Sequence, residues 1–266
     1  MKSKGNVLGL FSTPVYVSDD SYIIDDNLLE IINKFEKHTN PQVYRNACEY
    51  ADFGNYVSTA WLKIAEDENA TLWNATSVDR YILNDPSFSE LNDFLQRHVD
   101  NYAYNVLNLK NDVRFYITQS WFNYNNEMSS VHRHCHANSI ISGVFYVQGD
   151  HCPILFHSKD NVPFYGFEFS VKDYNFFNAS SWRINNDQYK VVLFPSRLEH
   201  SVAPNESKRQ RISLAFNTFM RGNVGMDDEL IGLDVDDEQF LVKGHDLLEE
   251  PYHSLLGSNQ NPIGVD

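Results

Sequence analysis

"VHRHCHANSIISGVFYV", residues 131–147, places three alternating histidines directly before an apolar run. Residues two apart on an extended strand point to the same side, so His132, His134 and His136 would share one face. Positions four apart on a strand lie roughly 13 Å from each other at the backbone, which is hard to reconcile with two ligands of one metal ion. We therefore expect at most two of these three histidines to bind the same ion.

A His-x-His pair is by itself a weak signal, because surface histidines also cluster in this way. A metal site needs a third ligand from elsewhere in the chain, and His200 is the candidate. It follows the apolar run Val191–Phe194 and a turn on Pro195 and Ser196. A histidine at the rim of a strand can face the mouth of a barrel, where ligand sites are frequent.

Arg211 and Ser213 come after His200 in the apolar run RISLAFNTF and lie on one face of it. A buried Arg is costly unless it is paired, and its guanidinium group suits a carboxylate. That carboxylate belongs either to an acid of this chain or to a bound ligand. Arg209 is a rival on the same face, but it lies in the charged loop NESKRQ and is expected to be exposed.

The chain is rich in aromatic residues, with 15 Tyr and 18 Phe among 266 residues, and aromatics favour β-structure. Helical spacing of apolar residues predicts helices over Asn27–His38 and over 84–107, after an edge strand interrupted by Pro14. Beyond residue 110 short β-type runs take over. This order predicts a mainly β fold with flanking helices. The runs are RFYITQSWFNYN, ISGVFYVQG, PILFHS, FYGFEFSV, YKVVLFPS and RISLAFNTF.

The net charge of −15 is uneven, because eleven acidic residues and one Lys after residue 225 contribute −10. We expect one domain over residues 1–222, with the N-terminal strand and helices in 1–110 and the β core in 111–222, and an acidic C-terminal extension over 223–266. No basic patch supports nucleic-acid binding, and no apolar stretch is long enough for a membrane span. Three cysteines without a CxxC spacing suit a reducing, cytoplasmic location.

Four segments taken together resemble the Fe(II)- and 2-oxoglutarate-dependent oxygenases: HxH, SGVFYV, LFPSRLEHSVAPN and RISLAFN. The branch that the chain resembles most contains oxygenases of marine bacteria and their phages related to the prolyl 4-hydroxylases, and LFSTPVYV and SWFNYNNE also resemble that branch. The resemblance covers about residues 8–222. It implies a double-stranded β-helix, the jelly-roll or cupin-like core. It also implies Fe(II), 2-oxoglutarate and O2 as cofactor and cosubstrates, with ascorbate as a further candidate.

In that family two histidines and usually one carboxylate hold the iron. Two registers of the motif compete: counting back from SGVFYV selects His134 and His136, and counting forward from Tyr124 selects His132 and His134. We prefer the first, because HCHANSIISGVFYV then needs no gap. The expected catalytic metal ligands are therefore His134, His136 and His200, with no Asp or Glu among them.

The resemblance also implies that an Arg-x-Ser pair binds the far carboxylate of 2-oxoglutarate, and Arg211 and Ser213 match this pair. Tyr146 and Asn123 are further candidates for binding the cosubstrate, although a core aromatic and an edge-facing amide explain them equally well. Asn217 lies on the same strand face as Arg211 and is expected to line the pocket.

Together these features imply a non-haem Fe(II)- and 2-oxoglutarate-dependent dioxygenase, a hydroxylase acting on a protein or peptide side chain as prolyl hydroxylases do, or on a small molecule. Two alternatives stay open: a β-helix protein that holds a metal ion and 2-oxoglutarate without turnover, and a three-histidine cupin-type dioxygenase that does not use 2-oxoglutarate. Trp121 and Cys135 are expected to fill the core. Histidine ligands must be deprotonated, so metal affinity is expected to fall as the pH drops towards ~6. The sequence leaves the oligomeric state open.

Overall fold

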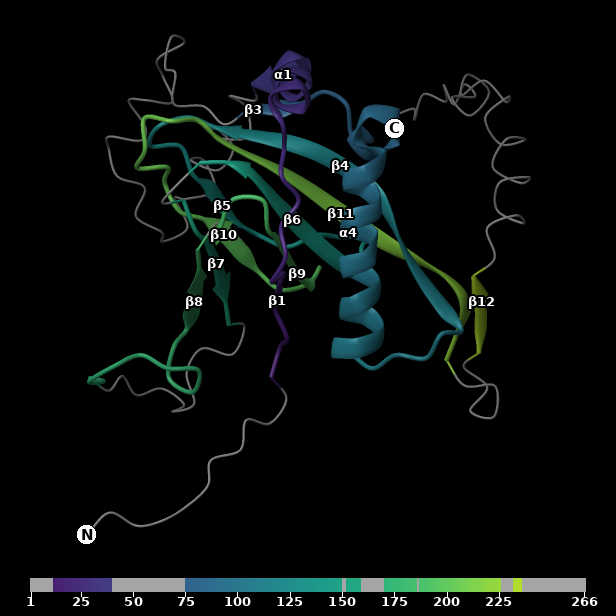
Figure 1. The fold of residues 1–266 in the computed structure, drawn as a ribbon. Helices are drawn as coiled ribbons and strands as arrows, with labels where there is room; N and C mark the ends of the chain where they lie inside the picture. Colours follow the sequence, from purple (N-terminus) through teal and green to yellow (C-terminus); the bar gives the residue numbers. More distant parts are fainter. Residues whose placement is uncertain are drawn as a thin grey trace, which may run out of the picture. The chain divides into compact units, whose positions relative to one another are not determined.

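The computed structural model of this chain is mainly β, with helices beside two antiparallel sheets (Figure 1), as the sequence predicts. Contacts along the chain divide it into two units, one made of residues 1–111 and 115–220 and the other of 112–114 and 221–266. The structure describes residues 12–39, 75–149, 152–158, 170–185, 187–225 and 232–235.

The larger sheet has eight strands within the described residues, in the order β1-β9-β6-β11-β4-β3-β2, with β12 paired to β11. Inside this sheet β6 lies between β9 and β11, and all of its residues except the last are buried. A strand buried on both faces reads as a continuous apolar run, which explains the lack of alternation in SGVFYV. The strands are β1 (Tyr16–Val17), β2 (Lys37–Thr39), β3 (Ala75–Ser77), β4 (Val113–Asn125), β6 (Ile141–Gln148), β9 (Val191–Pro195), β11 (Arg211–Val224) and β12 (Leu233–Val235).

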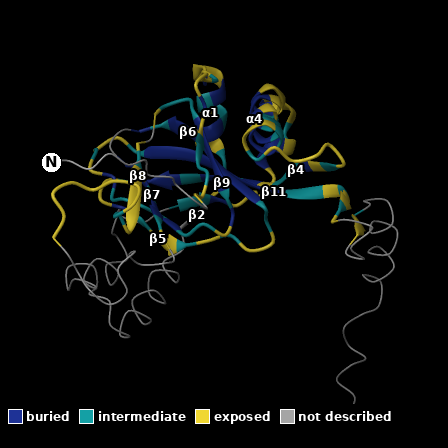
Figure 2. Ribbon diagram, turned by 90° about the horizontal axis from the view of Figure 1, so that it is seen from below, coloured by how far each residue is buried: buried dark blue, intermediate teal, exposed yellow. Residues whose placement is uncertain are grey.

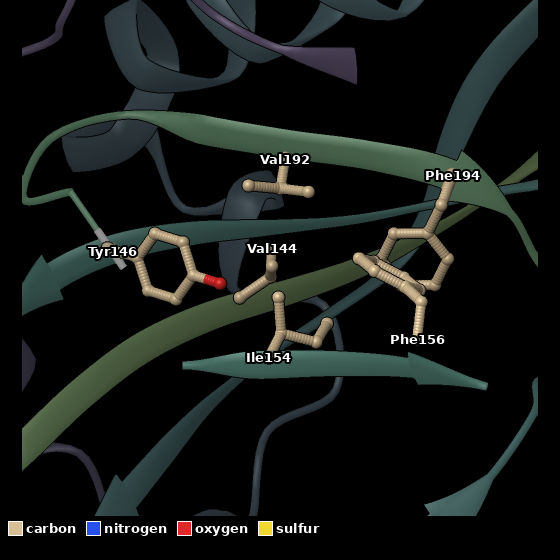
Figure 3. Packing of buried hydrophobic residues seen from close by; sticks show 6 residues of the cluster. All are labelled: Val144, Tyr146, Ile154, Phe156, Val192 and Phe194. Carbon is tan, nitrogen blue, oxygen red and sulfur yellow. The ribbon is translucent and has the colours of Figure 1, made fainter. Parts of the chain in front are cut away.

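The smaller sheet, as far as the described part of the chain extends, has the order β5-β10-β7-β8. Apolar side chains from both sheets meet between them (Figure 3) and form one buried cluster of Val144, Tyr146, Ile154, Phe156, Val192 and Phe194. Two facing antiparallel sheets with a shared core are the expected double-stranded β-helix. The strands of the smaller sheet are β5 (Val131–His134), β7 (Ile154–His157), β8 (Ser181–Ile184) and β10 (His200–Val202).

Two helices cover the face of the larger sheet that is turned away from the smaller one (Figure 2). In the helix α4 (Ser89–Asn101), Phe94 packs against Phe145 of β6, with ring centroids 6.3 Å apart. The helix α1 (Asp26–Lys34) is fastened to β4, because the Tyr124 hydroxyl donates to the Ile32 carbonyl oxygen at 2.6 Å. With helices on one side and the smaller sheet on the other, the central strands of the larger sheet are shielded from water.

Both predicted helices exist, but each differs from its predicted extent. The first ends at Lys34, earlier than expected, because Lys37–Thr39 forms β2 and pairs with β3. The second is not one regular helix over 84–107. It consists of two 3-10 turns, α4 and a final π-helical turn, which are η2 (Ile82–Asn84), η3 (Pro86–Phe88), α4 and η4 (Tyr102–Val106).

Most of the predicted β-type runs are strands in the structure. Five of them correspond to β4, β6, β7, β9 and β11, and the N-terminal edge strand is reduced to β1, which pairs with β9. Residues 164–169 of the run FYGFEFSV and the beginning of LFSTPVYV lie outside the described residues, as do Cys48, His151, His245 and His253. The last two residues of the run, Ser170 and Val171, are described and are not part of a strand. The sequence did not predict β3, β8 and β10, which are three or four residues long and only partly buried.

The second unit is described only at residues 112–114, 221–225 and 232–235. Here β12 pairs with the end of β11, and Gly222 has a φ of +106°, a conformation that favours glycine. A Cβ at Gly222 would also lie 2.2 Å from the Asp112 carbonyl oxygen. Most of the predicted acidic extension over 223–266 lies outside the described residues. None of the described helices is long and apolar enough to span a membrane.

Gly143 of β6 lies directly opposite Phe216 of β11, and an added Cβ would stand 2.1 Å from the Phe216 Cζ atom. Because Phe216 is fully buried and cannot move aside freely, we expect Gly143→Ala to lower the free energy of unfolding by about 1–3 kcal/mol. Urea unfolding measures this change. In a Phe216→Leu background, which removes the contacted ring atoms, the same substitution should cost less. An equal cost in both backgrounds would contradict the explanation.

Candidate metal and cosubstrate site

The smaller sheet brings together two histidines that are far apart in the sequence. His134 is the last residue of β5, His200 is the first residue of β10, and the two are direct partners across the antiparallel pair. Their ring centroids lie 4.3 Å apart. His200 is buried and His134 half-buried. The proximity is therefore set by backbone pairing and not by the side chains alone.

His136 joins this pair from the turn that follows β5. Its backbone N–H donates to the Ser196 carbonyl oxygen at 2.8 Å, which holds the turn against the end of β9. Its ring lies 5.3 Å from that of His134 and 5.1 Å from that of His200. One ring nitrogen from each of the three histidines lies within 4.8 Å of the others. His132 is exposed and stays outside this group.

Each of the three rings uses its Nδ1 atom for a hydrogen bond. The Nδ1 atoms of His134 and His200 contact the carbonyl oxygens of His132 at 2.8 Å and Leu198 at 3.0 Å. A carbonyl oxygen only accepts, so these Nδ1 atoms carry the proton. The Nδ1 of His136 contacts Asn217 Oδ1 at 2.7 Å. All three neutral rings therefore leave Nε2 as the lone-pair donor, the state that a metal ligand requires.

Burial favours the neutral form of all three histidines. It lowers the pKa of His200 to about 3, with a further contribution from the neighbouring His134. Burial also lowers the pKa of His134 and of His136 below the ordinary histidine value. Neutral imidazoles do not have to lose a proton before binding a metal ion. The sequence-based expectation of weakened metal binding near pH 6 is therefore revised to a lower pH.

One cavity of about 90 Å3 reaches all three histidines. It has room for several water molecules or a small organic acid. Among the described residues that line it, Arg211 is the only one with a permanent charge and there is no Asp or Glu. Glu127, the nearest acid in the sequence, is exposed. The lining is Trp121, Asn123, Val131, His134, His136, Gly143, Val144, Ile154, Phe194, His200, Val202, Arg211, Ser213 and Ala215.

Arg211 is almost completely buried, although no acid of the described chain pairs with it. Its Nη1 donates to Asn125 Oδ1 at 2.8 Å, while its Nε is buried without a hydrogen-bond partner. Gly149 allows β11 to approach, since a Cβ there would lie 2.8 Å from the Arg211 Cα. A buried cation with an unused donor is costly unless an anion pairs with it. Within the described residues, Arg211 thus has no counter-ion.

Two further buried polar atoms near Arg211, the Ser213 Oγ and the Tyr146 hydroxyl oxygen, have no hydrogen-bond partner in the part of the chain that the structure describes. Ser213 and Tyr146 face each other across β11 and β6, and the Arg211 guanidinium carbon lies 5.3 Å from the Tyr146 ring centroid. Burial raises the pKa of Tyr146 to about 12, so its hydroxyl keeps the proton at neutral pH. Three unused donors from two adjacent strands match the oxygens of a bound carboxylate.

The other residues singled out in the sequence have mixed positions. Asn123 lines the cavity as expected, and so does Trp121, which was expected in the core. Asn217 is not part of the lining, because its side chain points at His136 from behind. Cys135 is exposed, so its prediction as a core residue is wrong. Arg209 is exposed, as predicted.

Sequence reasoning missed the two residues that hold the site from outside the cavity, Asn125 and Ser142. Asn125 binds Arg211, and Ser142 Oγ lies 2.8 Å from the His136 Nδ1. Both are fully buried. A signal for them exists in the sequence: each is a polar residue within an otherwise apolar or aromatic strand, and a buried polar group requires a partner.

Residues 119–217 match the family model described as "Putative 2OG-Fe(II) oxygenase". The matched segment contains the three clustered histidines, Arg211 and Ser213. No curated protein matches the chain significantly.

Solved structures with a similar arrangement include an oxidoreductase of the 2OG-Fe(II) oxygenase family from Burkholderia pseudomallei, at 14% identity over 55% of this chain and 68% of that one, with a TM-score of 0.40. A prolyl-4-hydroxylase from Pseudomonas putida matches at 13% identity over 73% and 98%, with a TM-score of 0.36. HygX from Streptomyces hygroscopicus, with nickel, 2-oxoglutarate and hygromycin B bound, matches at 10% identity over 73% and 87%, with a TM-score of 0.37.

The metal-free protein is expected to lose stability as the pH falls below ~6.5, the ordinary histidine pKa. In the folded state His200 has a pKa of about 3, so in acid the unfolded state binds a proton that the folded state does not. From pH 7.5 to pH 5 this difference lowers the free energy of unfolding by roughly 2 kcal/mol. Denaturant unfolding at both pH values measures the loss. It should be smaller by that amount in His200→Gln, and an equal loss in both proteins would refute the assignment.

Proposed function

We propose that this chain, whose residues 119–217 match the 2OG-Fe(II) oxygenase family model, binds Fe(II) and 2-oxoglutarate in one cavity and hydroxylates a substrate. His134, His136 and His200 are the proposed metal ligands. Arg211 and Ser213, with Tyr146, are the proposed binding site for the far carboxylate of 2-oxoglutarate. One observation carries the proposal: the cavity that reaches three neutral imidazoles also reaches a buried arginine that has no acidic partner among the described residues.

The residues present fit both groups. Three Nε2 atoms are free of protein hydrogen bonds in the described network, and Nε2 of a neutral imidazole is a common metal donor. Arg211 Nε, Ser213 Oγ and the Tyr146 hydroxyl are unused donors, which a carboxylate would satisfy. Iron bound in this way would activate O2 and couple the decarboxylation of 2-oxoglutarate to succinate with oxidation of a C–H bond.

The chain's own residues then have distinct tasks. Arg211 orients 2-oxoglutarate by binding its far carboxylate, and Ser213 and Tyr146 add hydrogen bonds to the same group. Asn123, on the cavity wall, offers an amide to the cosubstrate or the substrate. The apolar side chains of Val144, Ile154 and Phe194 also line the cavity and exclude water from the reacting atoms.

A donor set of three histidines lacks the negative charge that one carboxylate would bring. Neutral imidazoles bind Fe(II), but they also suit Zn, Ni and Cu. Charge balance in the cavity then depends on the cosubstrate, a dianion. As the substrate class we propose a protein or peptide side chain, in the manner of the prolyl hydroxylases that the sequence resembles. A panel of proline-containing peptides and small molecules, scored by stimulated succinate formation, tests this choice.

Arg211→Gln is expected to weaken 2-oxoglutarate binding by about 30-fold or more, because a buried charge pair contributes roughly 2–5 kcal/mol. Anaerobic titration of the Fe(II)-loaded protein with 2-oxoglutarate, followed by the visible absorption of the complex, measures the affinity. Arg209→Gln is the matched control, since Arg209 lies two residues away and is exposed. Unchanged affinity in Arg211→Gln, or an equal loss in the control, would argue against the proposed anchor.

Turnover separates the proposal from its two rivals. With Fe(II), O2 and a substrate, the wild-type protein should convert 2-oxoglutarate to succinate, and His200→Ala should not. A protein that binds metal and 2-oxoglutarate but forms no succinate with any substrate would be a binding protein. Oxygen uptake that is independent of 2-oxoglutarate and unaffected by Arg211→Gln would indicate a cupin-type dioxygenase instead.

A further inference from the structure

His136 differs from the other two clustered histidines in what holds its ring. His134 and His200 donate Nδ1–H to backbone carbonyl oxygens two residues earlier in the chain. Only His136 depends on side chains, with Asn217 Oδ1 at 2.7 Å and Ser142 Oγ at 2.8 Å from its Nδ1. The orientation of the His136 ring can therefore be changed by mutating the side chains that bind its Nδ1.

Asn217 accepts the hydrogen bonds on the side of the His136 ring that carries Nδ1. Ser142 donates its hydroxyl proton to Asn217 Oδ1 at 2.9 Å, so it has no proton left for His136 and the proton between them belongs to the imidazole. Ser142 Oγ also contacts Ser196 Oγ at 2.8 Å, and Ser196 Oγ contacts Ser139 Oγ at 2.7 Å. Ser142 and Ser196 are fully buried and Asn217 almost so. The amide oxygen of Asn217 is thus the acceptor on which the network converges.

No acidic side chain of the described residues takes part in this network. Within the described residues, the hydrogen-bond acceptors of the three clustered rings are two backbone carbonyls and the Asn217 amide, helped by a serine hydroxyl. The groups that shift the pKa of these histidines include no acid. A carboxylate that accepts the Nδ1–H of a metal-binding histidine makes that imidazole a stronger donor. A neutral amide gives orientation without added donor strength.

We infer that Asn217 is the positioning residue that sets how strongly His136 binds a metal ion. Its amide oxygen fixes the Nδ1–H tautomer and turns Nε2 towards His134 and His200. Asn217→Asp would keep this hydrogen bond and add a negative charge one ring away from the ion, and Asn217→Ala would remove the acceptor. The inference rests on the metal role proposed above for His136, and it concerns metal affinity and not turnover.

Competition between the full-length protein and a chromogenic chelator for Zn2+ at pH 8 tests the inference. Asn217→Ala should bind Zn2+ about 10–100-fold more weakly than the wild type, the usual effect of removing such a partner. Asn217→Asp should bind Zn2+ more tightly than the wild type, because it keeps the acceptor and adds a negative charge. A merely structural role for Asn217 predicts no gain in Asn217→Asp, because the two side chains have the same shape. That outcome, or unchanged affinity in Asn217→Ala, would overturn the inference.

Two controls separate this inference from the proposed function. Asn205→Ala removes another fully buried amide, which bonds the backbone of Asn125, Ser207 and Arg209 and no histidine. Its Zn2+ affinity should stay at the wild-type value even if its melting temperature falls. His134→Ala should abolish tight Zn2+ binding. If His134→Ala loses Zn2+ binding but the Asn217 variants do not differ from one another, only the inference about Asn217 is wrong. If His134→Ala still binds Zn2+ normally, the proposed metal site is wrong as well.

Discussion

The antiparallel pairing of β5 with β10 is the constraint on which the site depends. It makes His134 and His200 direct neighbours, although 65 residues separate them in the sequence. Backbone hydrogen bonds fix this neighbourhood before any side chain contributes. A one-residue slip would turn one of the two rings out of the cavity. Only His136 is then placed by the turn after β5, and a backbone hydrogen bond from His136 to Ser196 holds that turn.

The second half of the site is built on the larger sheet and follows a different logic. Arg211 and Ser213 on β11 and Tyr146 on β6 are buried, yet three of their polar atoms have no hydrogen-bond partner among the described residues. Such unsatisfied donors are rare in folded proteins and cost stability. A site with a buried cation and no acid in its described lining is preorganised for an anion, since the fold has already met the cost of burying the charge.

Much of this arrangement could be predicted from the sequence. Apolar runs indicate which strands are buried, and the alternation along a strand indicates which side chains point to the same face. The central strands, the helices and the residue set His134, His136, His200 and Arg211 followed from such patterns and from the family resemblance. Three-residue strands such as β10 carry too little pattern to be found. The predicted position of Cys135 was wrong, because the chain leaves β5 at His134 and strand alternation no longer applies beyond it. The role of Asn217 depends on its contact with His136, 81 residues away, which no local pattern reports.

The backbone carbonyls that hold His134 and His200 have an evolutionary consequence. Every amino acid supplies a carbonyl oxygen, so substitutions at residues 132 and 198 preserve the acceptors of these two rings. Two of the three proposed metal ligands therefore keep their hydrogen-bond acceptors when neighbouring residues are substituted. At the third, His136, the proposed ligand and the side chains that bind it can change together. A descendant of this chain could exchange the donor at position 136 for another type while the rest of the metal cluster stays intact.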